Sequence, residues 1–86
     1  MVKPYDEIIL SDNEVIRTFS VSLDEDDLKW HWDEEDRMIE PIHKTDWMFQ
    51  FDNQLPIKLE GKIEIKKGVW HRLIKGNSDV RIKIKK

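Results

Sequence analysis

The C-terminal stretch VRIKIK alternates apolar and charged residues without a break, and this alternation constrains the fold more than any other sequence feature. Val80, Ile82 and Ile84 share one parity, and every residue of the other parity up to position 85 is arginine or lysine. Successive side chains of a β-strand point to opposite faces, so the pattern is typical of a strand with one buried and one solvated face.

The same period of two recurs along most of the chain, whereas the 3.6-residue period of an amphipathic helix is almost absent. Turn-forming segments separate the runs, namely DEDD, HKTD, DNQLP, KKG and GNSD. The predicted strands are residues 15–23, 28–33, 37–42, 47–51, 62–65, 69–75 and 80–85. Short strands at this spacing predict an all-β sandwich or barrel. Residues 1–14 are expected to form an N-terminal hairpin or an arm packed on another subunit.

The length of 86 residues predicts a single domain spanning 1–86, which can bury roughly 60% of the surface that its unfolded form exposes. The chain has no cysteine, which excludes disulfides, thiolate metal sites and cysteine nucleophiles, and favours the cytoplasm. The N-terminus lacks the pattern of a signal peptide, and no apolar run approaches the ~18 residues of a membrane span. We therefore expect a soluble, cytoplasmic protein.

Charge is unevenly distributed along the chain. Residues 1–54 carry 5 Lys and Arg against 15 Asp and Glu, while residues 55–86 carry 10 against 3. The basic half suggests nucleic acid as a partner, but the alternating charges at its C-terminus are better explained as the solvated face of a strand, which argues against this partner. The acidic run at 24–27 is interpreted as a charged turn, because its surroundings lack the spacing of a calcium loop.

Parity also assigns faces to the segments that carry histidine. His31 and Asp33 share a face, and the residues on either side of His31 point the other way. His71 shares its face with Leu73. The residues predicted to face outward are the indoles Trp30, Trp32 and Trp70. Because both faces are partly apolar, both need cover, and the barrel interior covers only one of them. The second cover is another subunit or the N-terminal arm, and we expect a homodimer formed through the outward-facing tryptophans.

The stretch WHWDEEDRMIE at 30–40, followed about thirty residues later by GVWHRL at 68–73, resembles the two signature motifs of small single-domain cupins. The resemblance covers residues 15–85 and implies a cupin-type jelly roll, also called a double-stranded β-helix. In cupins the first motif runs His-x-His and then to a glutamate, and the second ends in a further histidine. His31 stands at the first histidine position and His71 at the last.

Two of the four usual ligand positions depart from the cupin pattern, with Asp33 at the second histidine position and Arg37 at the glutamate position. The resemblance therefore implies a reduced ligand set of His31, Asp33 and His71, which suits iron, manganese, nickel or zinc. A slipped alignment would make Glu34, Glu35 or Asp36 the carboxylate ligand. Parity disfavours the first and last of these three unless a bulge intervenes.

Three states of this pocket remain open at the level of sequence. In the first, the two histidines and Asp33 bind a divalent metal, and Arg37 grips an anionic ligand at the mouth. In the second, Arg37 pairs with Asp33 in place of the ion, and the metal-free pocket binds an acidic or hydroxylated small molecule. In the third, the polar residues form a structural network and the domain works through its surface. The sequence does not decide whether the protein is an enzyme, because the cupin fold hosts both enzymes and binding modules.

Further candidates lie outside the two motifs. Gln50 alternates with two phenylalanines and is a candidate hydrogen-bond donor in the pocket, or an exterior polar residue. Trp47 follows the HKTD turn and is a candidate roof of the pocket, or plain core. His43 lies within that turn and is interpreted as a solvated loop residue. The sequence offers no serine nucleophile with a histidine–acid setting and no glycine-rich phosphate loop.

Overall fold

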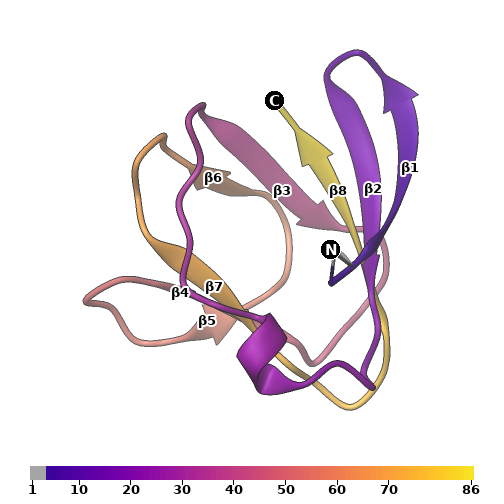
Figure 1. Cartoon of the computed structure of the whole chain (residues 1–86), viewed down its shortest axis with the longest axis vertical. Helices are drawn as coiled ribbons and strands as arrows, with labels where there is room; N and C mark the ends of the chain where they lie inside the picture. Colours follow the sequence, from indigo (N-terminus) through magenta and orange to yellow (C-terminus); the bar gives the residue numbers. More distant parts are fainter. Residues whose placement is uncertain (1–3) are drawn as a thin grey trace.

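A computed structural model describes residues 4–86 and places nearly all regular structure in two antiparallel sheets (Figure 1). One sheet has five strands in the order β1-β2-β8-β3-β6, and the other has three in the order β5-β4-β7. The two sheets form the opposing walls of a barrel, with the N-terminal hairpin at one side of the five-stranded sheet. The all-β prediction is confirmed.

The N-terminal hairpin and the C-terminal strand supply three of the five strands of the larger sheet. Strand β1 (Asp6–Ser11) turns at residues 12–13 and pairs with β2 (Glu14–Phe19). Strand β2 pairs in turn with β8 (Val80–Lys85), with Val15 opposite Ile84. The predicted alternation of buried and solvated residues at 80–85 is present in β8, whose residues at positions 80, 82 and 84 are buried. Of the two predictions for residues 1–14, the hairpin is present from Asp6 onward; residues 1–3 lie outside the described part of the chain.

Two further strands complete the larger sheet, and three form the smaller one. Strand β3 (Arg37–Pro41) lies between β8 and β6 (Ile63–Ile65). In the smaller sheet β4 (Met48–Phe51) is central, with β5 (Ile57–Lys58) on one side and β7 (His71–Ile74) on the other. The register of β4 and β7 sets Phe51 opposite His71, so this histidine is part of the smaller sheet.

The core lies between the sheets and consists of inward-pointing apolar side chains from both. Its members are Val15, Phe19, Ile39, Trp47, Phe49, Leu59, Ile63, Ile65, Val80, Ile82 and Ile84. Full burial of one such side chain contributes about 1.5–3 kcal/mol relative to an exposed position. Among the described residues, one polar residue is buried with this core, namely His71, with 3% of its surface exposed. The core therefore provides a rigid support behind this imidazole.

Three sequence predictions differ from the structure. The strand expected at residues 28–33 is wrong: Glu25–Asp27 form a short 3-10 helix, and the following segment makes an isolated β-bridge at His31. The strand expected at 15–23 ends at Phe19, because the chain turns at once, with the amide of Leu23 bonded to the Ser20 carbonyl. Strand β5 was not predicted, since it has two residues and follows a proline. Within the described residues, no helix is long and apolar enough to cross a membrane.

Candidate functional site

Two histidines that are forty residues apart in sequence meet through their backbones. The amide of His31 donates to the carbonyl of His71 at 3.0 Å, and the amide of His71 donates to the carbonyl of His31 at 2.9 Å. This reciprocal pair is the isolated antiparallel bridge, and residues directly opposite in such a bridge point to the same face. The two imidazole rings therefore lie together, with centroids 4.2 Å apart.

Asp33 is positioned by the corner that precedes β7. The amide of Gly68 donates to the carbonyl of Asp33 at 2.9 Å, and the amide of Lys67 donates to the Asp36 carboxylate at the same distance. Gly68 has a φ of 78°, in the left-handed region that glycine adopts without steric cost. The acidic segment is thus fixed along the corner, and Asp33 lies two residues beyond the histidine bridge on the same side.

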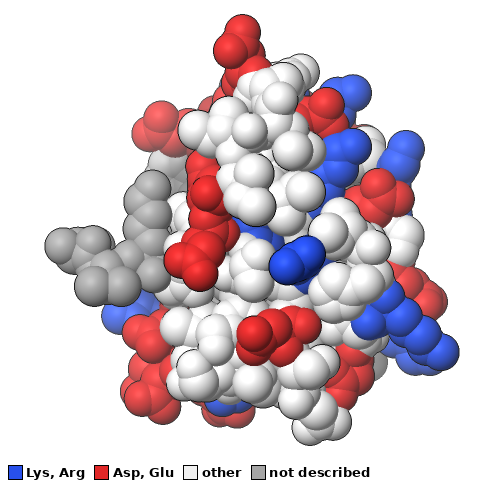
Figure 2. All heavy atoms as spheres, turned by 90° about the vertical axis from the view of Figure 1, so that its right-hand side faces the viewer, with Lys and Arg blue, Asp and Glu red and all other residues white. Residues whose placement is uncertain are grey.

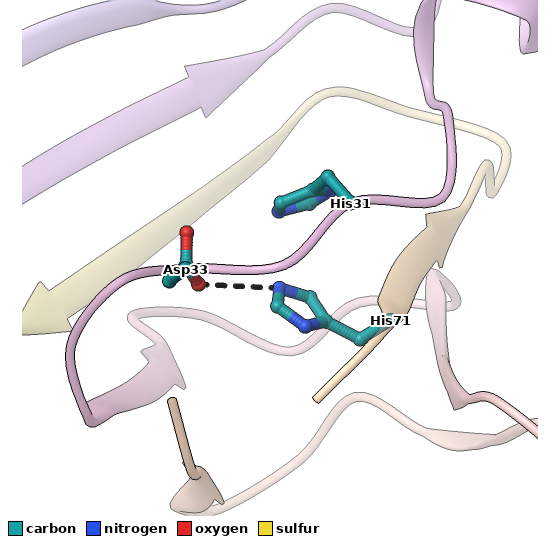
Figure 3. Close-up of side chains that lie close together, drawn as sticks. All are labelled: His31, Asp33 and His71. Atoms are coloured by element: carbon teal, nitrogen blue, oxygen red, sulfur yellow. Dashed lines mark ion pairs between the residues drawn. The ribbon is translucent and has the colours of Figure 1, made fainter. Parts of the chain in front are cut away.

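The three side chains converge on one small volume (Figure 3). One ligand atom from each of His31, Asp33 and His71 lies within 4.8 Å of the other two. The Nε2 atom of His71 is 3.4 Å from Oδ2 of Asp33, and the His31 ring lies alongside, carried by the same segment as Asp33. Two imidazoles and a carboxylate at this spacing are a ligand set for a divalent transition metal.

Backbone carbonyls fix the tautomer of both imidazoles. The Nδ1 atom of His71 is 2.8 Å from the carbonyl of Val69, and that of His31 is 3.2 Å from the carbonyl of Lys29. A carbonyl oxygen only accepts, so each Nδ1 carries the proton and donates it. In the neutral rings Nε2 is then left with a free lone pair. Such outer hydrogen bonds commonly orient and tune histidine ligands of metals.

Burial lowers the pKa of the His71 imidazole below its ordinary value of 6.5. The neighbouring His31 and Arg37 act in the same direction, while the Val69 carbonyl and Asp33 act against it. At neutral pH His71 is therefore uncharged. Its Nε2 lone pair and the Asp33 oxygen then face each other as two acceptors, an arrangement that a bound cation would relieve.

Arg37 contacts the same carboxylate from the other side. Its Nη1 lies 3.2 Å from Oδ1 of Asp33, and its Nη2 lies 3.6 Å from Oε1 of Glu35. The salt bridge that the sequence offered as one alternative is present, but the guanidinium is shared between two carboxylates. Oδ2 of Asp33 remains directed at His71. Arg37 Nε is buried and has no hydrogen-bond partner among the described residues.

A cavity of about 410 Å³ adjoins the cluster, which is within the usual range for small-molecule sites. His31, Asp33 and Arg37 contribute to its wall. Its other lining residues are Pro4, Tyr5, Arg17, Phe19, Asp27, Leu28, Lys29 and Leu73. Three of the lining side chains are cationic and two are carboxylates. The cavity wall therefore carries charges of both signs.

The remaining predicted residues lie elsewhere. Gln50 is paired with Arg72 on the face opposite to His71, and its side-chain oxygen accepts from Arg72 Nε at 2.9 Å. Trp47 is 1% exposed, belongs to the core and lines a separate cavity below the HKTD turn. His43 lines that second cavity, where its Nε2 accepts the amide of Arg81. The structure does not bring these residues into the histidine cluster.

Arg17 is a cavity residue that the sequence reasoning missed. It lies on β2 between Val15 and Phe19 at the parity of the buried face, and its Nε donates to Glu7 at 2.9 Å. Its guanidinium also lies 4.2 Å from the centroid of the Tyr5 ring. The sequence does contain a signal for this role, because Arg17 is a charged residue at an inward position of an amphipathic strand.

No protein-family model matches the sequence, and a comparison with curated proteins also finds no match. Solved structures do resemble the chain. A cupin domain from Bordetella pertussis superposes with a TM-score of 0.62 at 16% identity, covering 99% of this chain and 96% of that one. A cupin-2 domain containing protein from Shewanella frigidimarina gives 0.63 at 18% identity, covering 93% and 76%.

HppE, whose structure is of the iron(II) form in complex with substrate, gives a TM-score of 0.66 at 13% identity. The match covers 98% of this chain but spans 53% of HppE. At these identities the likeness concerns the fold. Together with the two antiparallel sheets, it shows that this chain is a small β-barrel of the cupin, or jelly-roll, fold.

Proposed function

We propose that this protein binds a divalent metal ion through His31, Asp33 and His71, and a small anionic or hydroxylated molecule in the adjoining cavity. The observation that carries the proposal is the shared tautomer of the two neighbouring imidazoles. Each has its Nδ1 committed to a backbone carbonyl, which leaves both Nε2 lone pairs free, and one ligand atom from each histidine lies within 4.8 Å of the carboxylate ligand atom. Iron, manganese, nickel and zinc all accept such donors.

The chain's own residues account for binding and orientation in this proposal. When bound, the ion would supply Lewis-acid polarisation of a ligand oxygen or a centre for binding oxygen. Arg37 would hold an anionic group of the ligand, since its Nε is buried without a hydrogen-bond partner among the described residues and the residue lines the cavity. Arg17, on β2 of the same sheet, also lines the cavity and would provide a second cation.

Elemental analysis of protein purified without a histidine tag tests the metal site. We expect close to one equivalent of iron, manganese, nickel or zinc after incubation and dialysis, and loss of that metal in His31→Ala and His71→Ala. His43→Ala is the matched control, because this third histidine lies outside the cluster and should leave the metal content unchanged. Absence of metal from the folded wild-type protein after incubation contradicts the proposal.

A metal-free binding module is the second candidate, and the Arg37–Asp33 ion pair favours it. In this form the guanidinium neutralises the carboxylate, and the two histidines with Arg37 bind an acidic or hydroxylated molecule, or act as a structural network. Calorimetric titration of metal-stripped protein with simple carboxylic acids and sugars separates the two candidates. Binding that is unaffected by added metal supports the module.

We also propose that the protein forms a homodimer in the cytoplasm. The indoles predicted to form the interface are exposed, with Trp30 at 37%, Trp32 at 47% and Trp70 at 46%. The edge strand β1 offers a second surface to the same kind of partner. Cell fractionation tests the location, and the oligomeric state of surface variants separates the two interfaces.

A further inference from the structure

Strand β1 is an edge strand that presents apolar side chains on both of its faces. It pairs with β2 on one side and ends the five-stranded sheet on the other. All six of its residues are exposed, with Ile8 at 62%, Ile9 at 73% and Leu10 at 50%. Figure 2 views the molecule from the side on which β1 lies and shows an uncharged surface in its upper half, bordered by acidic and basic groups.

The other outer strands are protected against pairing with a further chain, whereas β1 is not. Strand β5 has two residues, and β6 has three, with a lysine directly before and after it. Strand β7, the other edge of the smaller sheet, is covered at His71 by the backbone bridge to His31. Short edges and flanking lysines are the usual defences of sheet edges. Strand β1 has six residues without lysine or proline, and its one irregularity lies at its end, between Ile9 and Ser11. This edge is therefore suited to accept another strand.

We infer that β1 pairs antiparallel with β1 of a second copy, which joins the two five-stranded sheets across a two-fold axis. The sequence of the strand supports a second copy as its partner. Its first two residues are acidic and the next three are apolar, so an antiparallel copy brings the acidic end of each strand against the apolar or neutral end of the other. A parallel arrangement would instead oppose like charges at Asp6 and Glu7.

Symmetry restricts the register further. A two-fold axis between antiparallel strands is perpendicular to the sheet and keeps each side chain on its own face, so the pairing is centred on one residue meeting itself. Centring on Ile8 sets Glu7 opposite Ile9 of the second copy, and centring on Ile9 sets Glu7 opposite Ser11. Centring on Ile8 opposes no like charges, whereas centring on Ile9 brings Asp6 level with Asp12 just beyond the end of the strand, so the first register is favoured. Both registers cover the exposed isoleucines.

The pairing also reaches the cavity. Glu7 of β1 accepts the hydrogen bond of Arg17, which lines the cavity on β2. A second strand laid along β1 would hold Glu7, and through it Arg17, in place. The inference rests on the proposed function in one respect: both take a second copy of this chain as the partner. Metal content can be measured on monomeric variants, so the two can fail separately.

The mass of the protein in solution tests the inference. We expect sedimentation at micromolar concentration to give twice the mass of one chain, and the mass of one chain for the double variant Ile8→Lys with Ile9→Lys. Leu55→Lys is the matched control, since Leu55 is 85% exposed and lies outside the strands. A monomeric wild-type protein overturns the inference. So does a dimer that survives the double variant and dissociates in Trp32→Lys or Trp70→Lys.

A cysteine reporter checks the geometry without relying on dissociation. The chain has no cysteine, so Ile8→Cys and Ile9→Cys each introduce a single thiol. A two-fold antiparallel pair places its central residue beside its own copy, close enough for a disulfide to form under mild oxidation. We expect rapid cross-linking of one of these two variants and little cross-linking of Leu55→Cys. Equal cross-linking of all three variants overturns the inference.

Discussion

His31 and His71 exchange backbone hydrogen bonds at 3.0 and 2.9 Å, and this pair brings together two rings that the sequence separates by forty residues. The bridge is isolated, with irregular chain on both sides of His31. Its position next to the Gly68 corner also sets Asp33 beside the rings. The candidate metal site therefore depends on a short backbone contact rather than on a full strand.

The lowered pKa of His71 predicts that metal-free protein loses stability as the solution is acidified. Because the unfolded chain titrates this group near its ordinary value of 6.5 and the folded chain titrates it lower, the unfolded state binds the proton first. Stability is complete above pH 6.5 and falls below it, by up to about 1.4 kcal/mol per pH unit. Urea unfolding between pH 5 and 8 in the presence of a chelator measures this slope.

His71→Gln provides the control for the pH experiment. Glutamine is neutral throughout this range, so the variant should be less sensitive to pH between 6.5 and 5 than the wild-type protein. A wild-type slope equal to that of the variant would show that His71 does not contribute.

Replacing Arg37 by glutamine should strengthen metal binding and weaken the binding of an anionic ligand. The guanidinium competes for Asp33 and repels a divalent ion nearby. A unit charge at a few ångströms opposes such an ion by about 1–2 kcal/mol even in a water-like medium, which corresponds to about tenfold in affinity. Competition with a colorimetric chelator measures the change. Arg17→Gln is the control, because Arg17 pairs with Glu7 and should change the metal affinity less.

Truncation of Phe49 should severely destabilise the barrel. This side chain is 1% exposed, lies 4.8 Å from the Phe51 ring centroid and stacks on His71 at 5.6 Å. Phe49→Ala removes these contacts and leaves a cavity, at a cost of about 3–5 kcal/mol in the free energy of unfolding. Leu55→Ala, at an 85% exposed position, should cost less than about 0.5 kcal/mol. Chemical denaturation of both variants tests the difference.

Any side chain at Gly76 should lower the stability of the fold. A Cβ atom at this position would lie 2.8 Å from the backbone nitrogen of Trp47 and in collision with the Asp46 carboxylate. That carboxylate accepts the amide of Asn77, so the clash would also break the closure of the turn. Gly76→Ala should lower the free energy of unfolding by about 1–3 kcal/mol. A melting temperature equal to that of the wild-type protein would contradict this prediction.

The sequence by itself determined the β architecture and the buried and solvated faces of its regular strands, β8 above all. The alternation at residues 80–85 gave the buried and solvated faces of β8, and parity placed the indole of Trp70 outside while His71 lies inside. These inferences succeed because side-chain direction along an extended chain is a local property with a fixed period. The resemblance to cupins likewise identified the fold through the spacing of its two histidine motifs.

Only the tertiary structure decided how the site is assembled. The segment at 28–33 is held by the histidine bridge and by Gly68 rather than by a regular ladder, and no local pattern encodes such long-range contacts. The division of the Asp33 carboxylate between Arg37 and His71, the inclusion of Arg17 in the cavity wall and the exclusion of Gln50 also depend on which strands become neighbours. Strand neighbours are set by packing across the whole barrel, so they cannot be derived from the period of one segment.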